Sequence, residues 1–544
     1  MAKLCVRDLL ASHWSREAIV YHIYTRSFKD TNADGNGDIA GIIEKLDYLN
    51  DGTKDSLGIN TIWLSPIYQS PLHDGGYDIS DFKKIDPIFG DDDTFDRLIT
   101  EAHKRGIRIL MDFVPNHTSS SHQWFQESRS SDKNPKRDWY IWHAPKNNGL
   151  PNNWLSVFGG SAWELDSATN EYYLHTFFKE QPDLNWKNQD VRAAMIDNIH
   201  FWLNRGVDGF RTDSICHLLY DEQFRDDPLN PRYNPKIDLP YNKFLHTRSN
   251  ENIDLPDIIQ TFCEVLGNRK KSFMVSEAYI NIPEMGRLYR ACNNHLHAPF
   301  NFHLMSLPWN AQQYRIYIDT FESSLTDVDW PVYVLGNHDK PRVATRLGKN
   351  KARLTAMLLL SLRGMPFIYY GDEIGMENID IPLEQCHDPL TERKLANQSN
   401  RDAARTPMQW SPKPFAGFST HTPWLPIASN FQTCNVKTEC ENVKSLFNVY
   451  RSLINIRRKS KALTHGTYQS LVLPQKDVFT FIRETKNEKM LITLNFSDKS
   501  QLITLHYPKG TLICTTYLDQ DTPTSINLQA FTLRPLEGYI IRIR

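Results

Sequence analysis

Short apolar runs alternate with longer amphipathic segments over most of this chain. Seven of the runs have the length and composition of buried strands: Ile19–Tyr24, Thr61–Leu64, Arg108–Val114, Val207–Arg211, Phe273–Ser276, Pro331–Leu335 and Phe367–Tyr370. A weaker run near Phe300–Leu304 makes an eighth. Apolar positions recur with helical spacing over Phe95–Arg105, Val191–Asn204, Lys351–Leu362 and Val443–Arg458. Strands that alternate with helices form a parallel sheet, and eight such units predict an α/β fold of the (β/α)8 barrel type.

Two stretches interrupt this alternation. Residues 117–182 are polar, rich in tryptophan and too long for a simple loop, so we expect an inserted domain after the third strand. From about residue 464 the pattern changes to short alternating stretches such as VFTFIRE and KMLITLNFS, which are typical of antiparallel strands. The expected organisation is a barrel of residues 1–116 and 183–463 with an irregular subdomain at about 371–435, an inserted domain of residues 117–182, and a C-terminal antiparallel β-sandwich domain of residues 464–544.

The composition excludes several classes of partner. The formal net charge is −2 in 544 residues and no basic stripe is interleaved with aromatic residues, so we expect no nucleic-acid partner. The longest apolar stretch, near residues 354–362, is too short to cross a bilayer, so we expect no membrane partner. The N-terminus shows no apolar segment followed by a small-residue cleavage site.

The eight cysteines are scattered along the chain and form no CxxC pair. A protein of this size does not need disulfides for stability, so we expect reduced thiols and a cytoplasmic location. Cys434 and Cys440 are close enough in sequence to pair if the compartment were oxidising.

Ionisable residues stand where four of the predicted strands end. DFVPNH ends at His117, GVDGFRTD at Asp213, FMVSEAY contains Glu277, and VYVLGNHD ends at His338 and Asp339. A buried strand that ends in an ionisable residue is costly unless that residue faces a polar cavity. Active sites of these barrels lie at the C-terminal ends of the strands, so the four positions predict one catalytic site.

These motifs carry a family resemblance. DFVPNH, GFRTD, SEAY and LGNHD resemble the four short signature regions of the α-amylase superfamily of glycoside hydrolases (family 13). The segments YHIYTRSF, WLSPIY and RTPMQW are most similar to its branch of exo-acting α-glucosidases and oligo-1,6-glucosidases. DWYIW, NNWLSVFGGSAW and QPDLNW resemble bacterial α-glucosidases of that branch. The resemblance covers the barrel, the inserted domain and the β-sandwich.

The resemblance implies a retaining mechanism, with Asp213 as nucleophile, Glu277 as general acid/base and Asp339 as stabiliser of the transition state. Such a mechanism needs two carboxyl groups roughly 5–5.5 Å apart. Arg211 stands two residues before Asp213 on the same face of a strand, where it can keep Asp213 ionised. Glu277 follows the apolar run FMVS, so desolvation is expected to raise its pKa and keep it protonated.

Further residues are implied for substrate binding. Asp74 and Tyr77 in DGGYD match a loop that closes the pocket around the terminal glucose, and Arg401 matches the arginine that pairs with this aspartate. His117 and His338 are expected to hydrogen-bond sugar hydroxyls. A pocket closed at one end implies exo-hydrolysis of small α-glucosides such as maltose, sucrose and short malto-oligosaccharides.

Ser214 directly follows the expected nucleophile. In the resembling branch this position borders the leaving group, where valine accompanies α-1,6 cleavage and smaller residues accompany α-1,4 cleavage. We therefore expect α-1,4 and sucrose-type linkages to be preferred over α-1,6.

The segment DTNADGNGD is the candidate metal site. Oxygen ligands at alternating positions with glycine at the turn suit a hard cation, and Gly41 at the twelfth position excludes an EF-hand. In the resembling branch the equivalent loop holds a structural Ca²⁺ or Mg²⁺. The implied ligands are the side chains of Asp30, Asn32, Asp34 and Asp38 and the carbonyl of Asn36.

Several alternatives remain open within the superfamily. The chain could be an oligo-1,6-glucosidase, or a sucrose-specific hydrolase or transglucosylase, although the RLDR loop associated with sucrose isomerases is absent. A non-enzymatic relative, the heavy chain of amino-acid transporters, is disfavoured because this chain keeps all three carboxylates. We expect small α-glucosides as its partners and leave a monomer and a homodimer as alternatives.

Overall fold

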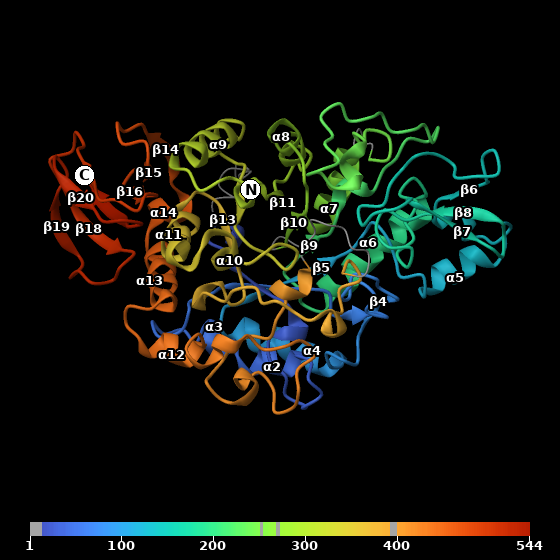
Figure 1. The fold of residues 1–544 in the computed structure, drawn as a ribbon, viewed down its shortest axis with the longest axis horizontal. Coiled ribbons are helices and arrows are strands. Elements are labelled where there is room, and N and C mark those ends of the chain that lie inside the picture. The colour runs from blue at the N-terminus through green and yellow to red at the C-terminus, as the bar shows by residue number, and fades with distance from the viewer. Residues whose placement is uncertain (1–12, 251–253, 268–271, 392–399) are drawn as a thin grey trace, which may run out of the picture.

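A computed structural model describes residues 13–250, 254–267, 272–391 and 400–544. Eight parallel strands close into a barrel in which each strand pairs with the next along the ring, and the last pairs with the first. The strands, in ring order, are β1 (Val20–Ile23), β2 (Thr61–Leu64), β5 (Arg108–Phe113), β9 (Gly209–Thr212), β10 (Phe273–Ser276), β11 (His297–Asn301), β12 (Val332–Val334) and β13 (Met365–Tyr369). The predicted (β/α)8 fold is therefore confirmed (Figure 1).

The weakest predicted strand was misplaced. The structure ends β11 at Asn301, and the chain then enters the short 3-10 helix His303–Met305. Two residues hid the strand from the hydropathy pattern: Pro299 and the polar His297, both of which are buried. His297 is tolerated there because its Nε2 lies 2.7 Å from the hydroxyl of Ser276 on the neighbouring strand.

Helices surround the barrel where the helical spacing predicts them. They are α4 (Asp92–Lys104), α6 (Gln189–Asn204), α11 (Ala352–Ser361) and α13 (Leu446–Lys459). Three further helices cover the barrel where the hydropathy pattern predicts none: α7 (Leu255–Gly267), α8 (Ile282–Arg290) and α9 (Ala311–Ser323). Shorter elements complete this part: α2 (Ile39–Glu44), α3 (Leu46–Leu49), β3 (Tyr68–Gln69), β4 (Asp81–Ile85), α10 (Val343–Leu347), α12 (Val436–Glu441) and α14 (Lys461–His465).

The chain between β5 and α6 forms a separate body at one side of the barrel (Figure 1). It contains α5 (Gln123–Ser130) and a three-stranded antiparallel sheet of β6 (Trp142–His143), β8 (Glu171–Leu174) and β7 (Trp163–Asp166). A small core of its own includes Trp154 and Trp163, and Tyr220 and Phe224 pack into it from the segment that follows β9. The long segment of residues 218–250 therefore packs against the inserted domain as part of its core. The sequence pattern did not predict this packing.

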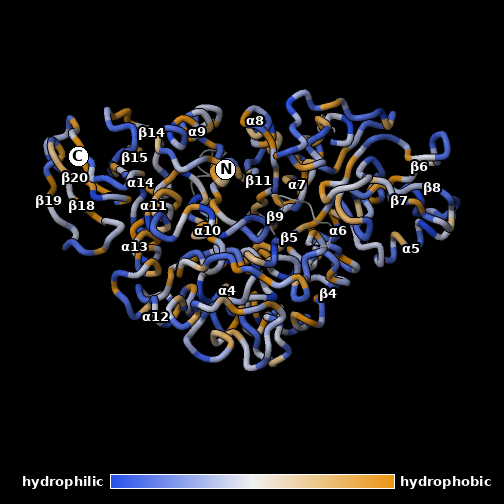
Figure 2. The backbone as a smooth tube through the Cα atoms, in the orientation of Figure 1, coloured by the Kyte–Doolittle hydropathy of each residue, from blue (hydrophilic) through white to orange (hydrophobic). Residues whose placement is uncertain are grey.

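The C-terminal domain is antiparallel, as predicted. Its six-stranded sheet has the order β14 (Thr467–Leu471), β15 (Val478–Glu484), β16 (Lys489–Asn495), β21 (Gly538–Ile543), β18 (Lys509–Thr515) and β19 (Thr524–Asn527). The strands β17 (Gln501–Ile503) and β20 (Phe531–Leu533) pair separately. Hydrophobic stretches run through the interior elements, whereas many peripheral loops are hydrophilic (Figure 2).

The prediction of reduced thiols is wrong for one pair of cysteines. Cys263 on α7 and Cys292 after α8 form a disulfide, with their Cα atoms 5.8 Å apart. The two helices flank β10 on either side in sequence, and this packing brings together residues that the sequence spacing does not relate. Cys434 and Cys440 are both free, and Cys5 lies outside the described residues. Among the residues described, no helix is long and apolar enough to cross a membrane.

Candidate active site

The expected nucleophile and acid/base stand at the ends of adjacent parallel strands. Asp213 follows β9 and Glu277 follows β10, and β9 pairs in register with β10. The guanidinium of Arg211, on β9, donates to Asp213 at 2.7 Å and to Glu277 at 2.6 Å. It donates also to Asp112 at the end of β5, at 2.8 Å. One cation therefore faces three carboxyl groups, and all four side chains are buried.

Burial shapes the protonation of this group. It raises the pKa of Glu277 more than Arg211 lowers it, and the neighbouring Asp213 and Asp339 raise it further. Burial also raises the pKa of Asp213, but Arg211 and a hydrogen bond from Glu277 oppose that shift. The arrangement favours a proton on Glu277 and a charge on Asp213, which is the division of roles that a general acid and a nucleophile require.

The backbone at Ser214 is left-handed, with φ 45° and ψ 37°. This conformation is uncommon for residues other than glycine and is often found at functional sites. It directs the Ser214 N–H toward Glu277 Oε2, at 3.2 Å. Ser214 thus helps to orient the Glu277 carboxyl group through its backbone.

Asp339 follows β12 and is surrounded by basic groups. Arg405 donates to Asp339 Oδ1 at 3.0 Å, Arg401 lies 3.5 Å from the same oxygen, and His338 lies 3.3 Å from Oδ2. Burial would raise the pKa of Asp339, but His338, Arg401 and Arg405 together lower it well below the usual range. Burial lowers the pKa of His338 to about 3, so its ring is neutral. Asp339 is therefore an anion at neutral pH.

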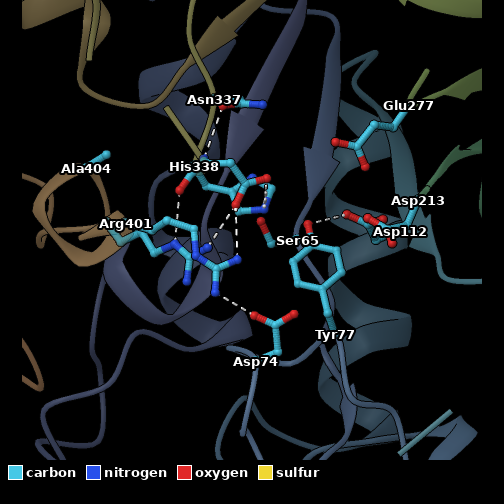
Figure 3. A network of polar contacts seen from close by, with 12 residues as sticks. Ser65, Asp74, Tyr77, Asp112, Asp213, Glu277, Asn337, His338, Arg401 and Ala404 are labelled. Carbon is cyan, nitrogen blue, oxygen red and sulfur yellow. Dashed lines mark hydrogen bonds and ion pairs between the residues drawn. The ribbon is translucent and has the colours of Figure 1, made fainter. Parts of the chain in front are cut away.

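An ion pair closes one end of the site (Figure 3). Arg401 Nη2 lies 2.7 Å from Asp74 Oδ1, and Asp388 holds the same guanidinium through two hydrogen bonds of 2.8 and 3.0 Å. Tyr77 stands between this ion pair and the carboxyl groups of Asp112 and Asp213 (Figure 3). Its ring stacks on His338 with the centroids 5.3 Å apart, and its hydroxyl donates to Asp112 at 3.1 Å.

His117 lies beside this closed end. Its Nε2 is 3.2 Å from the carbonyl of Tyr77 and 3.0 Å from the amide nitrogen of Gln181. Burial lowers the pKa of His117 to about 4, so the ring is neutral and can exchange hydrogen bonds with a hydroxyl. Gln181 donates also to Asp74, at 3.1 Å, and so links two of the expected sugar-binding residues.

The structure brings all ten residues expected at the catalytic and binding site into one region, and nine of them line a single cavity of about 930 Å³. Arg211 is the tenth: it does not line the cavity, but it donates to Asp213 and Glu277, which do. Sequence reasoning missed Asp112, Gln181, Asp388 and Arg405. Asp112, Gln181 and Arg405 stand within the quoted motifs DFVPNH, QPDLNW and RTPMQW, which was the available signal. No motif marked Asp388.

The candidate metal loop lies outside this cavity. Asp30, Asn32 and Asp34 each accept a hydrogen bond from the backbone N–H two residues ahead. Asp38 instead caps α2 through the N–H of Gly41, at 2.6 Å. Asn36 accepts through its side chain from Arg26, at 2.7 Å. In the part of the chain that the structure describes, no three His, Cys, Asp or Glu residues form a group that could hold a metal ion.

Comparison with known proteins accounts for this geometry. Residues 22–466 match the model of the alpha amylase catalytic domain. The chain belongs to the α-amylase family. As a member of it, the chain is a glycoside hydrolase, and the predicted resemblance is confirmed.

Relatives are similar over nearly the full chain. An oligo-1,6-glucosidase of Parageobacillus thermoglucosidasius is 37% identical over 98% of this chain and 99% of its own length. An alpha-glucosidase of Apis mellifera is 38% identical, over 91% and 88% of the two chains. The crystal structure of an alpha-glucosyl transfer enzyme superposes with a TM-score of 0.91 at 34% identity, covering 98% and 100%.

Proposed function

We propose that this protein is a retaining exo-α-glucosidase that releases α-glucose from the non-reducing end of small α-glucosides. The observation that carries the proposal is the pair of carboxyl groups, Asp213 and Glu277, held by one guanidinium beside a pocket closed by Asp74 and Arg401. Retention requires two carboxyl groups close together, and an exo mode requires a closed end.

In the first step the Asp213 carboxylate attacks the anomeric carbon of the bound glucose. The bond between that carbon and the glycosidic oxygen breaks, and the proton of Glu277 passes to the departing oxygen. Asp339 keeps its negative charge near the positive charge that develops on the sugar ring. The products of this step are a glucosyl ester on Asp213 and a free leaving group.

In the second step Glu277 acts as a base. Its carboxylate takes a proton from water, whose oxygen attacks the anomeric carbon and displaces Asp213. Two inversions leave the released glucose in the α configuration. An alcohol in place of water gives transglucosylation by the same step, which is the basis of the transglucosylase alternative.

The closed end favours chain ends over internal bonds. Asp74, Arg401 and Asp388 form a buried charged group behind the position of the terminal sugar. A longer chain cannot continue past that group, so substrates enter with the non-reducing glucose first. Maltose, sucrose and short malto-oligosaccharides are the substrates we propose.

The linkage preference rests on Ser214. Its small side chain lines the cavity next to the leaving group, and we propose that it favours α-1,4 and sucrose-type bonds over α-1,6. Oligo-1,6-glucosidase activity is the second candidate, because several relatives of 35–38% identity over most of the chain carry that name. A panel of maltose, sucrose and isomaltose separates the two.

The test of the mechanism is the anomer of the first product. Proton NMR of p-nitrophenyl α-glucoside hydrolysis in its first minutes is expected to show α-glucose before mutarotation, and β-glucose as the first product would contradict retention. Asp213→Asn is expected to abolish turnover with an unchanged circular dichroism spectrum. Hydrolysis of maltose by Asp213→Asn at near the wild-type rate would exclude Asp213 as the nucleophile.

We propose in addition that the loop of residues 30–38 binds a structural Ca²⁺ or Mg²⁺. Its side chains offer oxygen donors at alternating positions, which is the chemistry these cations prefer, and each engaged carboxylate oxygen keeps a second lone pair. Asp38 fits least well, because its carboxylate already caps α2.

A cytoplasmic location stays a prediction, as does a monomeric or homodimeric state. The Cys263–Cys292 disulfide is the observation against a cytoplasmic location, because disulfides persist mainly in oxidising compartments.

A further inference from the structure

The segment of residues 239–250 forms one wall of the cavity. Seven of its side chains line the cavity: Leu239, Tyr241, Asn242, Leu245, His246, Thr247 and Asn250. Within this wall the rings of Tyr241 and His246 stack with centroids 3.7 Å apart and an interplanar angle of 9°. The pair is a flat aromatic surface on an irregular loop, where a side chain needs support to hold one orientation.

His246 is held at both ring nitrogens. Its Nε2 lies 2.7 Å from the carbonyl oxygen of Tyr241, which can only accept, so Nε2 carries a hydrogen. Its Nδ1 lies 3.3 Å from Asp227 Oδ2 and 3.2 Å from the hydroxyl of Ser249. The ring therefore cannot rotate without losing a partner, and through the stack it fixes Tyr241.

Asp227 is the anchor of the wall and is only 2% exposed. Its carboxylate accepts from the backbone N–H of Arg248 at 2.8 Å and of Ser249 at 3.2 Å. Hydrogen bonds to these N–H groups, to Ser249 and to His246 lower its pKa against the opposing effect of burial, so it is ionised.

The anchor is itself fixed by the inserted domain. The Asp227 N–H donates to Asn153 Oδ1 at 2.8 Å, and the Asn153 side-chain amide donates to the Asp227 carbonyl at 2.9 Å. A continuous series of contacts thus leads from the inserted domain through Asp227 and His246 to Tyr241.

We propose that Tyr241 and His246 form the surface against which the leaving group packs, and that Asp227 is the residue that positions them. This inference rests on the proposed function, since a leaving group exists only if glucosides are cleaved here. The ligand is the ring of the group that departs, such as the second glucose of maltose. Aromatic rings suit this purpose because they give a large, rigid contact surface at low entropic cost.

The test compares two substrates that share the glucose and differ in the leaving group. Cleavage of maltose releases its second glucose, which is a sugar ring. Cleavage of α-glucosyl fluoride releases only fluoride, which has no ring to pack against the wall. We expect Tyr241→Ala to lower kcat/KM for maltose about tenfold and to change that for glucosyl fluoride less than about twofold. Tyr233→Ala is the matched control, because Tyr233 is a half-buried tyrosine of the longer segment of residues 218–250 and does not line the cavity.

The positioning role has its own pair of variants. Asp227→Asn keeps the size of the side chain but removes its charge, and is expected to lower kcat/KM for maltose while sparing glucosyl fluoride. His246→Gln is expected to do the same while the buried Asp227 stays in place with its backbone hydrogen bonds, which covers the case in which Asp227→Asn fails to fold.

The outcomes separate the two proposals. Tyr241→Ala and His246→Gln that leave the maltose-to-fluoride ratio at its wild-type value would overturn the assignment of the wall. An equal fall for both substrates would overturn it too, since that pattern belongs to the glucose end. A wild-type protein inactive on glucosyl fluoride and maltose alike would instead contradict the proposed function.

Discussion

Charge balance around Arg211 is the central feature at the scale of single residues. Three carboxyl groups, Asp112, Asp213 and Glu277, share this one guanidinium in a buried site. Three buried anions around one cation cannot all be ionised without a large cost, so one of them holds a proton. Burial raises the pKa of all three groups, and it raises that of Glu277 furthest, to about 8. Glu277 is therefore the group expected to hold the proton that the proposed mechanism passes to the leaving group.

The pH dependence of Glu277 follows from this balance. Its raised pKa extends the protonated, active form to higher pH, and activity on maltose is expected to fall as the pH rises through that pKa. Glu277→Gln is expected to lose about 10²–10⁴-fold on maltose, which needs protonation of the leaving oxygen. With 2,4-dinitrophenyl α-glucoside, whose leaving group needs no proton, burst-phase glucosylation is expected to persist and to lack the alkaline fall. An alkaline limb unchanged in this variant would assign the acid to another group.

Ser214 is the residue expected to set the linkage preference. Replacing it by valine is expected to raise the isomaltose-to-maltose ratio of kcat/KM by about tenfold, because a larger side chain alters the room for the leaving sugar. Because Ser214 has a φ of 45°, the β-branched valine is strained at this position. The effect of that strain on activity has to be separated from a change in linkage preference.

Two further measurements keep strain and specificity apart. Ser214→Ala removes the hydroxyl without branching and serves as the control. Strain would lower the melting temperature and both kcat/KM values together, whereas specificity changes only their ratio. Isomaltose as the best substrate of the wild type would contradict the proposed preference.

At the scale of elements, hydropathy located best two short strands in which every residue is buried. Thr61–Leu64 and Phe273–Ser276 were predicted to the residue because both are uninterrupted buried runs. β11 was predicted three residues too far along the chain, because Pro299 and His297 interrupt the apolar pattern. Only tertiary contacts make these two residues acceptable in a strand.

The site residues at the ends of strands could likewise be predicted from the sequence, whereas those on irregular segments could not. Asp213, Glu277 and Asp339 end barrel strands, so topology alone predicts that they meet. Asp388 and Asp227 act from irregular segments, whose path depends on contacts with remote parts of the chain, such as the pairing of Asp227 with Asn153. Spacing along the chain holds no information about such contacts.

The loop of residues 30–38 gives the prediction that belongs to this scale. A cation that binds only the folded state raises stability by mass action, so a chelator is expected to lower the melting temperature by several degrees without changing the reaction. Asp34→Ala is expected to abolish that sensitivity. Asp51→Ala is the control, because Asp51 is also exposed and also accepts the N–H two residues ahead, but stands outside the loop. A melting curve indifferent to chelator and to added Ca²⁺ would contradict the site.

The barrel and the C-terminal domain form one folding body at the scale of the whole molecule. Phe479, Phe481 and Ile492 of the C-terminal sheet belong to the same continuous hydrophobic core as the barrel strands, whereas a second, smaller core lies on the other side of the sheet. The inserted domain is joined to that core through Phe125, Tyr140 and Tyr173, and it has in addition a smaller core of six buried residues, one of which is Tyr220. We therefore expect the C-terminal domain to unfold with the barrel rather than before it.

Arg483 tests this coupling. It stands on β15, is 0% exposed, and donates to the carbonyls of Ser361, at the end of α11, and of Gly466 and Thr467, at 2.9 to 3.1 Å. Arg483→Met removes a buried charge, which offsets part of the loss, but leaves these carbonyls without a donor, at about 1–3 kcal/mol each. We expect a net loss of about 3 kcal/mol in the free energy of unfolding, measured in urea by circular dichroism and by activity. Both signals are expected to shift together, because the two domains share one core. Arg542→Met, at an exposed position of the same sheet, is the control and is expected to change stability by less than about 0.5 kcal/mol. If circular dichroism showed an early transition at urea concentrations that leave activity intact, the C-terminal domain would be unfolding on its own, and the single folding body would be wrong.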